Sequence, residues 1–281
     1  MEWREKSWRC PISERSVRFW RGGEGSGEEG VRGDGPLWNV ERKSRVERHC
    51  YQMARFARAV VTGTPHHVTQ RGIDQQRVFF TDADRHVYLD NLTRHCAQAR
   101  ARILAYCLMP NHVHLVLVPE EEDALAVAMR RTHSRYATYL NARRDRVGHL
   151  WQNRFFSCAM DDAHLWVALR YVERNPVRAH MVGRPEEYVW SSAAAHVGTN
   201  LAGSALLDWG FHKEAGGAER WRSLLAEPEE IEAVRRLQKA TFSGRPVGDA
   251  EFIARLEKEL GRSLAPKRGV RIGSVREASA A

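Results

Sequence analysis

The chain of 281 residues lacks paired cysteines, a long apolar run and an internal repeat. Its five cysteines are an odd number and form no C-x-x-C pair, which argues against a disulfide framework and a zinc ribbon and favours reduced thiols. No apolar run reaches the length of a membrane span, and the first residues show no signal-peptide pattern. We therefore expect a soluble, cytoplasmic protein without a membrane partner.

The charge of the chain is strongly one-sided. Lysine and arginine number 44 against 35 acidic residues, a formal net charge of +9. Such an excess favours an anionic partner, most often nucleic acid, because cationic side chains contact phosphates and release counterions. The alternative is that the charge only keeps the protein soluble. The hydrophobic fraction of 43% is enough for a real core.

Composition divides the chain into three predicted parts. Residues 1–52 include a glycine-rich, charged stretch without apolar periodicity, so we expect a disordered leader or a segment that is not translated. Residues 53–198 carry a sharp hydrophobic pattern and are predicted to form the main domain. Residues 199–281 are predicted to be a helical extension with a basic tail.

Within the main domain the pattern predicts six elements in the order strand, helix, hairpin, helix, strand, helix. They are a strand at 60–69, a helix capped at Thr81 or Asp82, strands at 103–109 and 112–118 joined by Pro110-Asn111, a helix at 123–141, a strand after 148–156, and a helix from Asp161 or Asp162 that Pro176 ends. This order predicts an α+β fold, a ferredoxin-like antiparallel sheet with helices on one face. The extension is predicted to contain helices around 231–237 and 249–260.

The strand that begins at His112 carries two histidines one residue apart. Because side chains on a strand alternate between faces, His112 and His114 point to one side, and Val113 points to the other. Two imidazoles on a mostly buried strand are costly unless their nitrogens are satisfied, and a divalent metal ion satisfies them well. The alternative is a pair of core histidines bonded to backbone or water.

The last helix of the main domain carries Tyr171 outside its apolar stripe. Asn175 follows one turn later on the same flank, so a phenol and an amide carbonyl point the same way. Taken alone, this pattern favours a boundary aromatic residue and a helix-ending asparagine.

Four ordered blocks give the chain a family resemblance. The blocks are Pro65–Gly72 (PHHVTQRG), Tyr106–Val116 (YCLMPNHVHLV), Gly148–Phe155 (GHLWQNRF) and Tyr171–Ala179 (YVERNPVRA). Together they closely resemble the single-tyrosine transposases with a histidine-hydrophobe-histidine (HUH) motif, specifically the branch of REP-associated tyrosine transposases. The resemblance runs from Met53 to about residue 198.

The resemblance implies a role for each residue that matches the family motifs. His112 and His114 match the metal-binding pair, Asn175 the third ligand and Tyr171 the catalytic nucleophile. The implied fold is the ferredoxin-like HUH palm. The implied activity is metal-dependent nicking and rejoining of single-stranded or hairpin DNA through a 5′-phosphotyrosine, with Mg²⁺ or Mn²⁺ as the ion. A homodimer is compatible with the resemblance.

Candidate DNA contacts are arginines and one glutamine near the predicted site. They are Gln70, Arg71, Arg143, Arg144, Arg146 and Arg154. Trp151, Phe155 and Phe156 interleave with them and suggest stacking on unpaired bases, although core aromatics beside a solvated basic face fit equally well. Two other functions stay open at this point: a catalytically silent regulator that binds hairpin DNA, and a zinc-dependent hydrolase.

Overall fold

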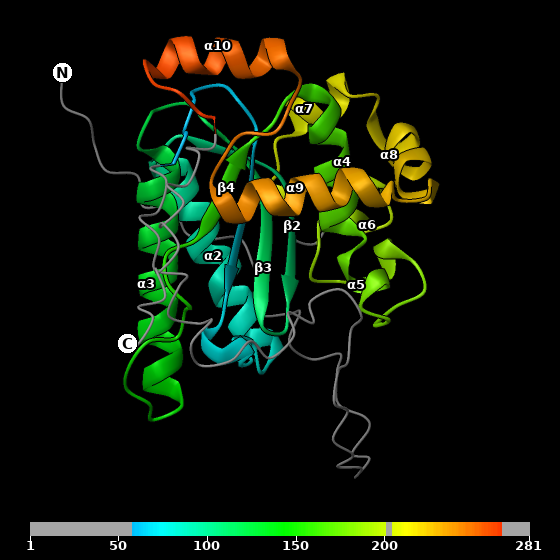
Figure 1. Ribbon diagram of the computed structural model, residues 1–281. Coiled ribbons are helices and arrows are strands. Elements are labelled where there is room, and N and C mark those ends of the chain that lie inside the picture. Colours follow the sequence, from blue (N-terminus) through cyan, green and yellow to red (C-terminus); the bar gives the residue numbers. More distant parts are fainter. Residues whose placement is uncertain (1–57, 201–203, 266–281) are drawn as a thin grey trace, which may run out of the picture. The chain divides into compact units, whose positions relative to one another are not determined.

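The computed structural model describes residues 58–200 and 204–265 (Figure 1). The predicted leader at 1–52 and most of the basic tail lie outside these residues. The strands are β1 (His66–Arg71), β2 (Ala101–Met109), β3 (His112–Pro119) and β4 (Phe156–Ala159). The helices are α2 (Asp82–Gln98), α3 (Ala124–Arg143), α4 (Asp162–Glu173), α5 (Asn175–Arg178), α6 (Ala193–His196), α7 (Trp209–Glu214), α8 (Gly217–Ala226), α9 (Ile231–Ser243) and α10 (Ala250–Leu260), with 3-10 turns at Ile73–Gln75, Pro185–Glu187 and Ser204–Leu206.

The four strands form one antiparallel sheet in the order β2-β3-β1-β4. The strand pairs that are adjacent in this sheet are β2 with β3, β3 with β1, and β1 with β4. With α2 between β1 and β2, and α3 between β3 and β4, this is the ferredoxin-like arrangement. The predicted α+β fold class is therefore confirmed.

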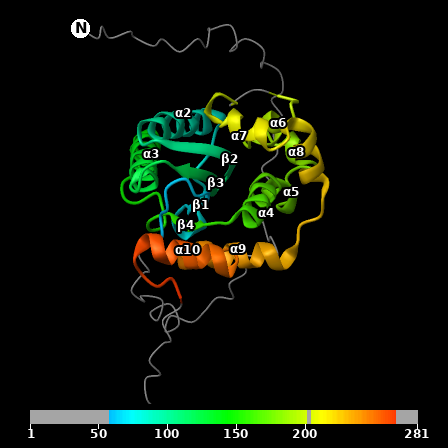
Figure 2. The same ribbon diagram turned by 90° about the horizontal axis from the view of Figure 1, so that it is seen from above.

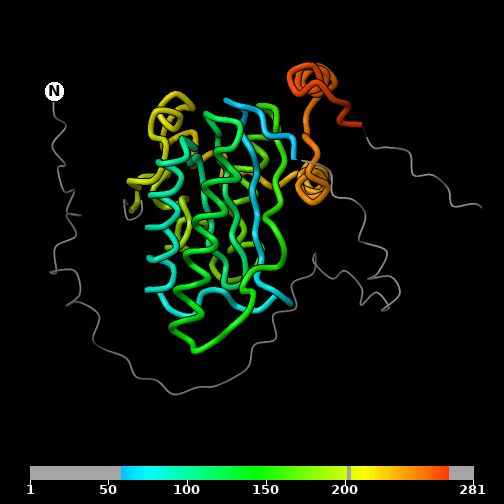
Figure 3. Tube along the Cα trace, turned by 90° about the vertical axis from the view of Figure 1, so that its left-hand side faces the viewer, coloured from blue at the N-terminus to red at the C-terminus, as the bar shows by residue number. Residues whose placement is uncertain are grey.

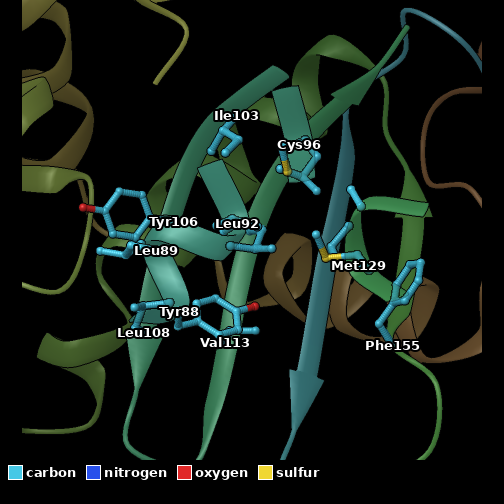
Figure 4. Packing of buried hydrophobic residues seen from close by; sticks show 14 of the residues in the cluster. Tyr88, Leu89, Leu92, Cys96, Ile103, Tyr106, Leu108, Val113, Met129 and Phe155 are labelled. Atoms are coloured by element: carbon cyan, nitrogen blue, oxygen red, sulfur yellow. The ribbon is translucent and has the colours of Figure 1, made fainter. Parts of the chain in front are cut away.

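Helices α2 and α3 cover the first face of the sheet. Val113, Leu115 and Leu117 of β3 are fully buried there, together with Leu92 of α2 and Met129 of α3 (Figure 4). These three β3 residues are the ones that alternation separates from His112 and His114. Burial of such large apolar side chains contributes roughly 1.5–3 kcal/mol each to the stability of this layer.

The second face of the sheet is also covered, which the sequence did not predict. Helices α4 and α9 lie on this side, opposite α2 and α3 (Figures 2 and 3). Val116 and Val118 of β3 are buried here against Leu169 of α4 and Leu237 of α9. Because β3 is apolar on both faces, it needs a helical layer on each side.

The predicted helix boundaries have local causes that the structure shows. The Thr81 side chain accepts a hydrogen bond from the backbone of Asp84, whose carboxylate bonds back to the Thr81 backbone as a capping box. At the start of α4, the Asp161 side chain accepts a hydrogen bond from the His164 backbone N–H. Pro176 was expected to end the helix of Tyr171. Helix α4 does end before it, at Glu173, and Pro176 lies in the first turn of the short helix α5, where a missing backbone N–H has no cost.

The predicted extension packs onto the main domain. Helix α9 contacts β4 and α4, and Phe252 and Leu256 of α10 pack against Ala59 and Ala159. Among the described residues, the helices after residue 198 therefore pack against the elements before it, on both sides of the predicted boundary. None of the helices in that part is long and apolar enough to cross a membrane.

The buried His133 makes stability depend on pH. Burial lowers its pKa from 6.5 to about 3, so the folded protein keeps this ring neutral where the unfolded chain binds a proton. Between these pH values the free energy of unfolding falls with falling pH by up to about 1.4 kcal/mol per pH unit for this residue. We expect H133Q to lose less stability between about pH 7 and pH 5 than the unmodified protein, in urea unfolding at each pH. The same substitution at the exposed His149 is the control, and an equal slope for all three proteins would contradict the assignment.

Candidate functional site

The pairing of β1 with β3 gathers polar side chains on the second face of the sheet. His112 lies opposite Arg71, His114 opposite Thr69, and His67 pairs with Val116. Directly paired residues of antiparallel strands project to the same side. His67 and Arg71 therefore share a face with the predicted metal-binding pair.

Three imidazoles form a continuous cluster on this face. The ring centroids of His112 and His114 are 4.9 Å apart and edge-on, and the rings of His67 and His114 are nearly parallel, at 10°, with their centroids 5.2 Å apart. A hydrogen bond of 3.0 Å joins His67 Nε2 to His114 Nδ1. His67 and His114 are buried, whereas His112, at the start of β3, is half-buried.

Helix α4 brings Tyr171 onto the same cluster. Its ring meets His114 edge-on at 5.3 Å and His67 at 5.7 Å between centroids. Gln238 of α9 donates a hydrogen bond of 3.2 Å to the Tyr171 hydroxyl, and the Arg178 guanidinium lies 4.2 Å from the ring centroid. The phenol and the histidine pair, which lie 57 or more positions apart in the sequence, thus share one site.

The surroundings keep all these groups neutral. Burial lowers the pKa of His67 and of His112 to about 3, with Arg71 and Arg178 adding to the effect at His112. The pKa of His114 is also lowered well below its ordinary value, first by burial and then by its two histidine neighbours. Burial raises the pKa of the Tyr171 phenol, and the Arg178 charge opposes this. At neutral pH the imidazole lone pairs are therefore free of protons, as a metal ion requires.

The histidine pair fits a divalent ion. Asn111 Oδ1 lies 2.5 Å from His112 Nδ1 and can only accept, so Nδ1 carries the proton and Nε2 presents a lone pair. His114 Nε2 is buried and has no hydrogen-bond partner among the described residues. Those residues contain no group of three or more His, Cys, Asp or Glu side chains spaced to hold a metal. A third protein ligand would therefore come from another residue type, and Asn175, buried at the start of α5, carries an amide oxygen.

Two of the six predicted DNA contacts lie side by side on β1 but on opposite faces. Arg71 is on the face of the site, where burial lowers its pKa and the Tyr171 hydroxyl is its electrostatic neighbour. Gln70 is buried on the other face and donates to the backbone oxygens of Gln152 and Asn153. In the structure Gln70 therefore supports a loop and does not reach the surface.

The other four predicted contacts are exposed, Arg143 at the end of α3 and the other three in the segment that joins α3 to β4. Arg143 pairs with Asp84 at 3.0 Å, Arg146 donates to Gln76 at 3.0 Å, and Arg144 stacks on a phenylalanine ring. Arg154 follows in the same segment. These arginines gather on one exposed stretch of chain.

Backbone hydrogen bonds tie this segment to the end of β1. Gln152 N donates to Arg71 O at 2.8 Å, and Gly72 N donates to Asn111 O at 2.9 Å in the hairpin turn. The basic segment, the end of β1 and the turn before His112 therefore meet at the same end of the sheet. This places exposed cationic side chains at the end of the sheet where His112 begins β3.

The aromatic residues next to these arginines are buried or partly buried. Phe155 is buried beneath the Arg58 guanidinium, and Trp151 donates to the His133 backbone oxygen. Phe156 packs against Phe242 of α9. The core alternative is thus borne out for Phe155, and Trp151 packs against the same core while partly buried.

Sequence reasoning missed four residues at the site: His67, Arg178, Gln238 and Thr241. Alternation along β1 already places His67 with Arg71, but only the register with β3 shows that it meets His114. Gln238 and Thr241 come from α9, whose packing against the sheet has no local signal in the sequence.

Helix α4 is anchored at its C-terminal end by a buried carboxylate. Glu173 accepts hydrogen bonds from Trp221 Nε1 at 3.1 Å, from His196 Nδ1 at 2.6 Å and from the Ser192 hydroxyl. The three donors come from α8, α6 and the residue before α6. They fix the helix turn that follows Tyr171.

Comparisons with known proteins find similarity in the first part of the described chain. Residues 61–175 match the family model described as Transposase IS200 like. A Haemophilus influenzae protein named as a REP-associated tyrosine transposase is 26% identical over 126 residues, which cover 41% of this chain and 70% of that protein. The resemblance predicted from the sequence is confirmed for this part of the chain.

Two solved structures are also similar. A REP-associated tyrosine transposase bound to a REP hairpin shares 17% identity at a TM-score of 0.46, covering 52% of this chain and 86% of that one. A Deinococcus radiodurans protein described as a transposase shares 17% identity at a TM-score of 0.31, covering 43% of this chain and 97% of that one.

Removal of the Glu173 carboxylate should loosen the attachment of α4. The substitution E173A leaves the buried N–H groups of Trp221 and His196 without an acceptor, whereas the Ser192 hydroxyl can still donate to the Tyr106 backbone oxygen. We expect the two lost bonds to cost about 3 kcal/mol in the free energy of unfolding. Urea unfolding measures the loss, with E219A at an exposed position of α8 as the control. A loss no larger than that of the control would contradict the anchoring role.

Proposed function

From the match of residues 61–175 to the IS200-like transposases, we propose that this protein is a metal-dependent DNA strand transferase. It nicks and rejoins single-stranded or hairpin DNA, with Tyr171 as the nucleophile and His112, His114 and Asn175 as ligands of Mg²⁺ or Mn²⁺. The observation that carries the proposal is the contact of the Tyr171 ring with His114, 5.3 Å between centroids, on the face that also holds His112.

The proposed reaction exchanges one phosphodiester bond for another. Tyr171 Oη attacks phosphorus and loses its proton, the bond from phosphorus to the leaving 3′-oxygen breaks, and that oxygen takes up a proton. The product is a 5′-phosphotyrosine and a free 3′-hydroxyl, and attack by a 3′-hydroxyl on the same phosphorus reverses the step. When bound, the divalent ion supplies charge stabilisation at the phosphate oxygens.

The chain's own cations support this step. The Arg178 guanidinium over the Tyr171 ring favours the phenolate that attacks, against the burial that disfavours it. Arg71, opposite His112 on the neighbouring strand, can bind a phosphate oxygen. The exposed arginines at 143, 144, 146 and 154 extend the cationic surface along which a DNA backbone would lie.

The site is closed in this structure. Tyr171 is only 1% exposed and His114 only 2%. Gln238 holds the hydroxyl that has to attack. A DNA strand can therefore reach the phenol only after α9 moves away from the site locally.

The two alternative functions have less support. A catalytically silent hairpin-binding regulator has no need of a phenol against the histidine pair, yet Tyr171, His112 and His114 are all present and in one cluster. A zinc-dependent hydrolase needs a carboxylate base beside the histidines. The described residues contain no metal-spaced group that includes one.

The substitution Y171F tests the nucleophile. It removes the hydroxyl and one hydrogen bond but keeps the ring that packs against His114 and His67. We expect no covalent protein–DNA adduct with labelled hairpin or single-stranded oligonucleotides on denaturing gels, because no oxygen remains to attack phosphorus. The control is Y188F, which also removes one buried hydroxyl, here bonded to the Leu108 backbone. An adduct with Y171F at the level of the control would refute the assignment.

Removal of the ion or of a ligand tests the metal centre. We expect EDTA to abolish adduct formation and added Mn²⁺ to restore it. We expect H114A to weaken Mn²⁺ binding, measured by calorimetry, by about 100-fold or more, because it deletes a direct ligand. H149A, at an exposed histidine of the basic segment, is the control. Equal Mn²⁺ affinity of H114A and H149A would rule out the proposed centre.

A further inference from the structure

We propose that His67 and Thr241 are positioning residues, which hold His114 in the one tautomer that presents its Nε2 lone pair to a metal ion. This inference deepens the proposed function and rests on it. It makes α9, which lies outside the segment that matches the transposase family, a part of the site.

The chain of hydrogen bonds begins at Thr241 on α9. Its Oγ1 lies 2.8 Å from the Leu237 backbone oxygen, which can only accept, and in the proposed arrangement the single hydroxyl proton of Thr241 is donated there. Thr241 Oγ1 therefore acts as an acceptor toward its other neighbours. These are His67 Nδ1 at 2.8 Å and the Cys158 thiol at 3.2 Å.

The direction of this first bond determines the next two. Because Thr241 accepts, the proton of the neutral His67 ring is on Nδ1, and His67 Nε2 carries a lone pair. His114 Nδ1 lies 3.0 Å from that lone pair and so must donate to it. The proton of the His114 ring is thereby placed on Nδ1, and Nε2 has none.

Burial keeps water from forming hydrogen bonds to the side chains of Thr241, His67 and His114. Thr241, His67 and His114 are each at most 2% exposed, so water offers no substitute partner. His114 Nε2 is left as a buried acceptor without a partner in the described part of the chain, which is costly unless it binds a ligand. The unpaired His114 Nε2 is a second, independent observation. It indicates that the hydrogen bonds from Thr241 to His114 orient a ligand-binding nitrogen and do not only hold α9 in place.

His112 shows the same arrangement with a different partner. Its Nδ1 is held by Asn111 Oδ1, as His114 Nδ1 is held by His67 Nε2. Both imidazoles thus have Nδ1 protonated and Nε2 available. Groups that orient a ligating histidine in this way typically change metal affinity 10–100-fold when they are lost.

The first test reads the ring protons directly in the metal-free protein. Long-range ¹H–¹⁵N spectra of histidine distinguish the two neutral tautomers. We expect His67 and His114 both to carry the proton on Nδ1, with signals assigned by comparison with the H67F and H114A variants. A His114 ring protonated on Nε2 would overturn the inference, whatever the protein does to DNA.

The second test uses a matched pair of variants at Thr241. T241V keeps the shape but loses the acceptor, and T241S keeps the hydroxyl. We expect T241V to bind Mn²⁺ about tenfold or more weakly and to lose the uniform Nδ1 protonation of His67 and His114, while T241S behaves like the unmodified protein. T132V removes an equally buried threonine hydroxyl in the α2–α3 layer and controls for lost stability.

The outcomes separate this inference from the proposed function. Equal Mn²⁺ affinity for T241V and T241S would show that Thr241 has no positioning role, even if Y171F lacks the adduct. If the tautomers and the Mn²⁺ affinities are as predicted but Y171F still forms the adduct, the metal site is supported. The assignment of Tyr171 as the nucleophile is then refuted. H67F, which removes the acceptor for His114 while keeping a ring, repeats the affinity test if T241V does not fold.

Discussion

The register between β1 and β3 is the constraint on which the site depends. It places Arg71 opposite His112 and brings His67 onto the face of His114. A shift by one residue would turn His67 and Arg71 to the other face, into the layer of α2 and α3. That shift is opposed by Val68, which is fully buried in that layer together with Val113 and Leu115 of β3. The apolar core on one face thus maintains the polar cluster on the other.

Burial also sets the chemistry of the cluster. Covering by α4 and α9 lowers the pKa of His67 and His112 to about 3 and raises that of the Tyr171 phenol. The same desolvation therefore keeps the imidazoles unprotonated, as the proposed metal ion requires, and disfavours the phenolate that the proposed reaction needs. A resident cation, Arg178, already lies against the Tyr171 ring.

The parts of this account that the sequence predicted are those with local causes. Alternation along β3 placed His112 and His114 together, and the capping residues Thr81 and Asp161 marked the starts of two helices. The same alternation argued against grouping Gln70 with Arg71, since neighbours on a strand face opposite ways, and the structure buries Gln70. The contributions of α9 could not be predicted, because its contact with β4 joins segments about 80 residues apart through packing alone.

The central claim is that one divalent ion, the histidine pair and the Tyr171 hydroxyl occupy the same place. Crystals soaked in Mn²⁺ and measured with X-rays at the manganese absorption edge test it most directly. The account predicts one anomalous peak about 2.2 Å from the Nε2 atoms of both His112 and His114, on the side that faces Tyr171. A manganese peak bound elsewhere, or bound to His112 and His114 through Nδ1, would contradict it.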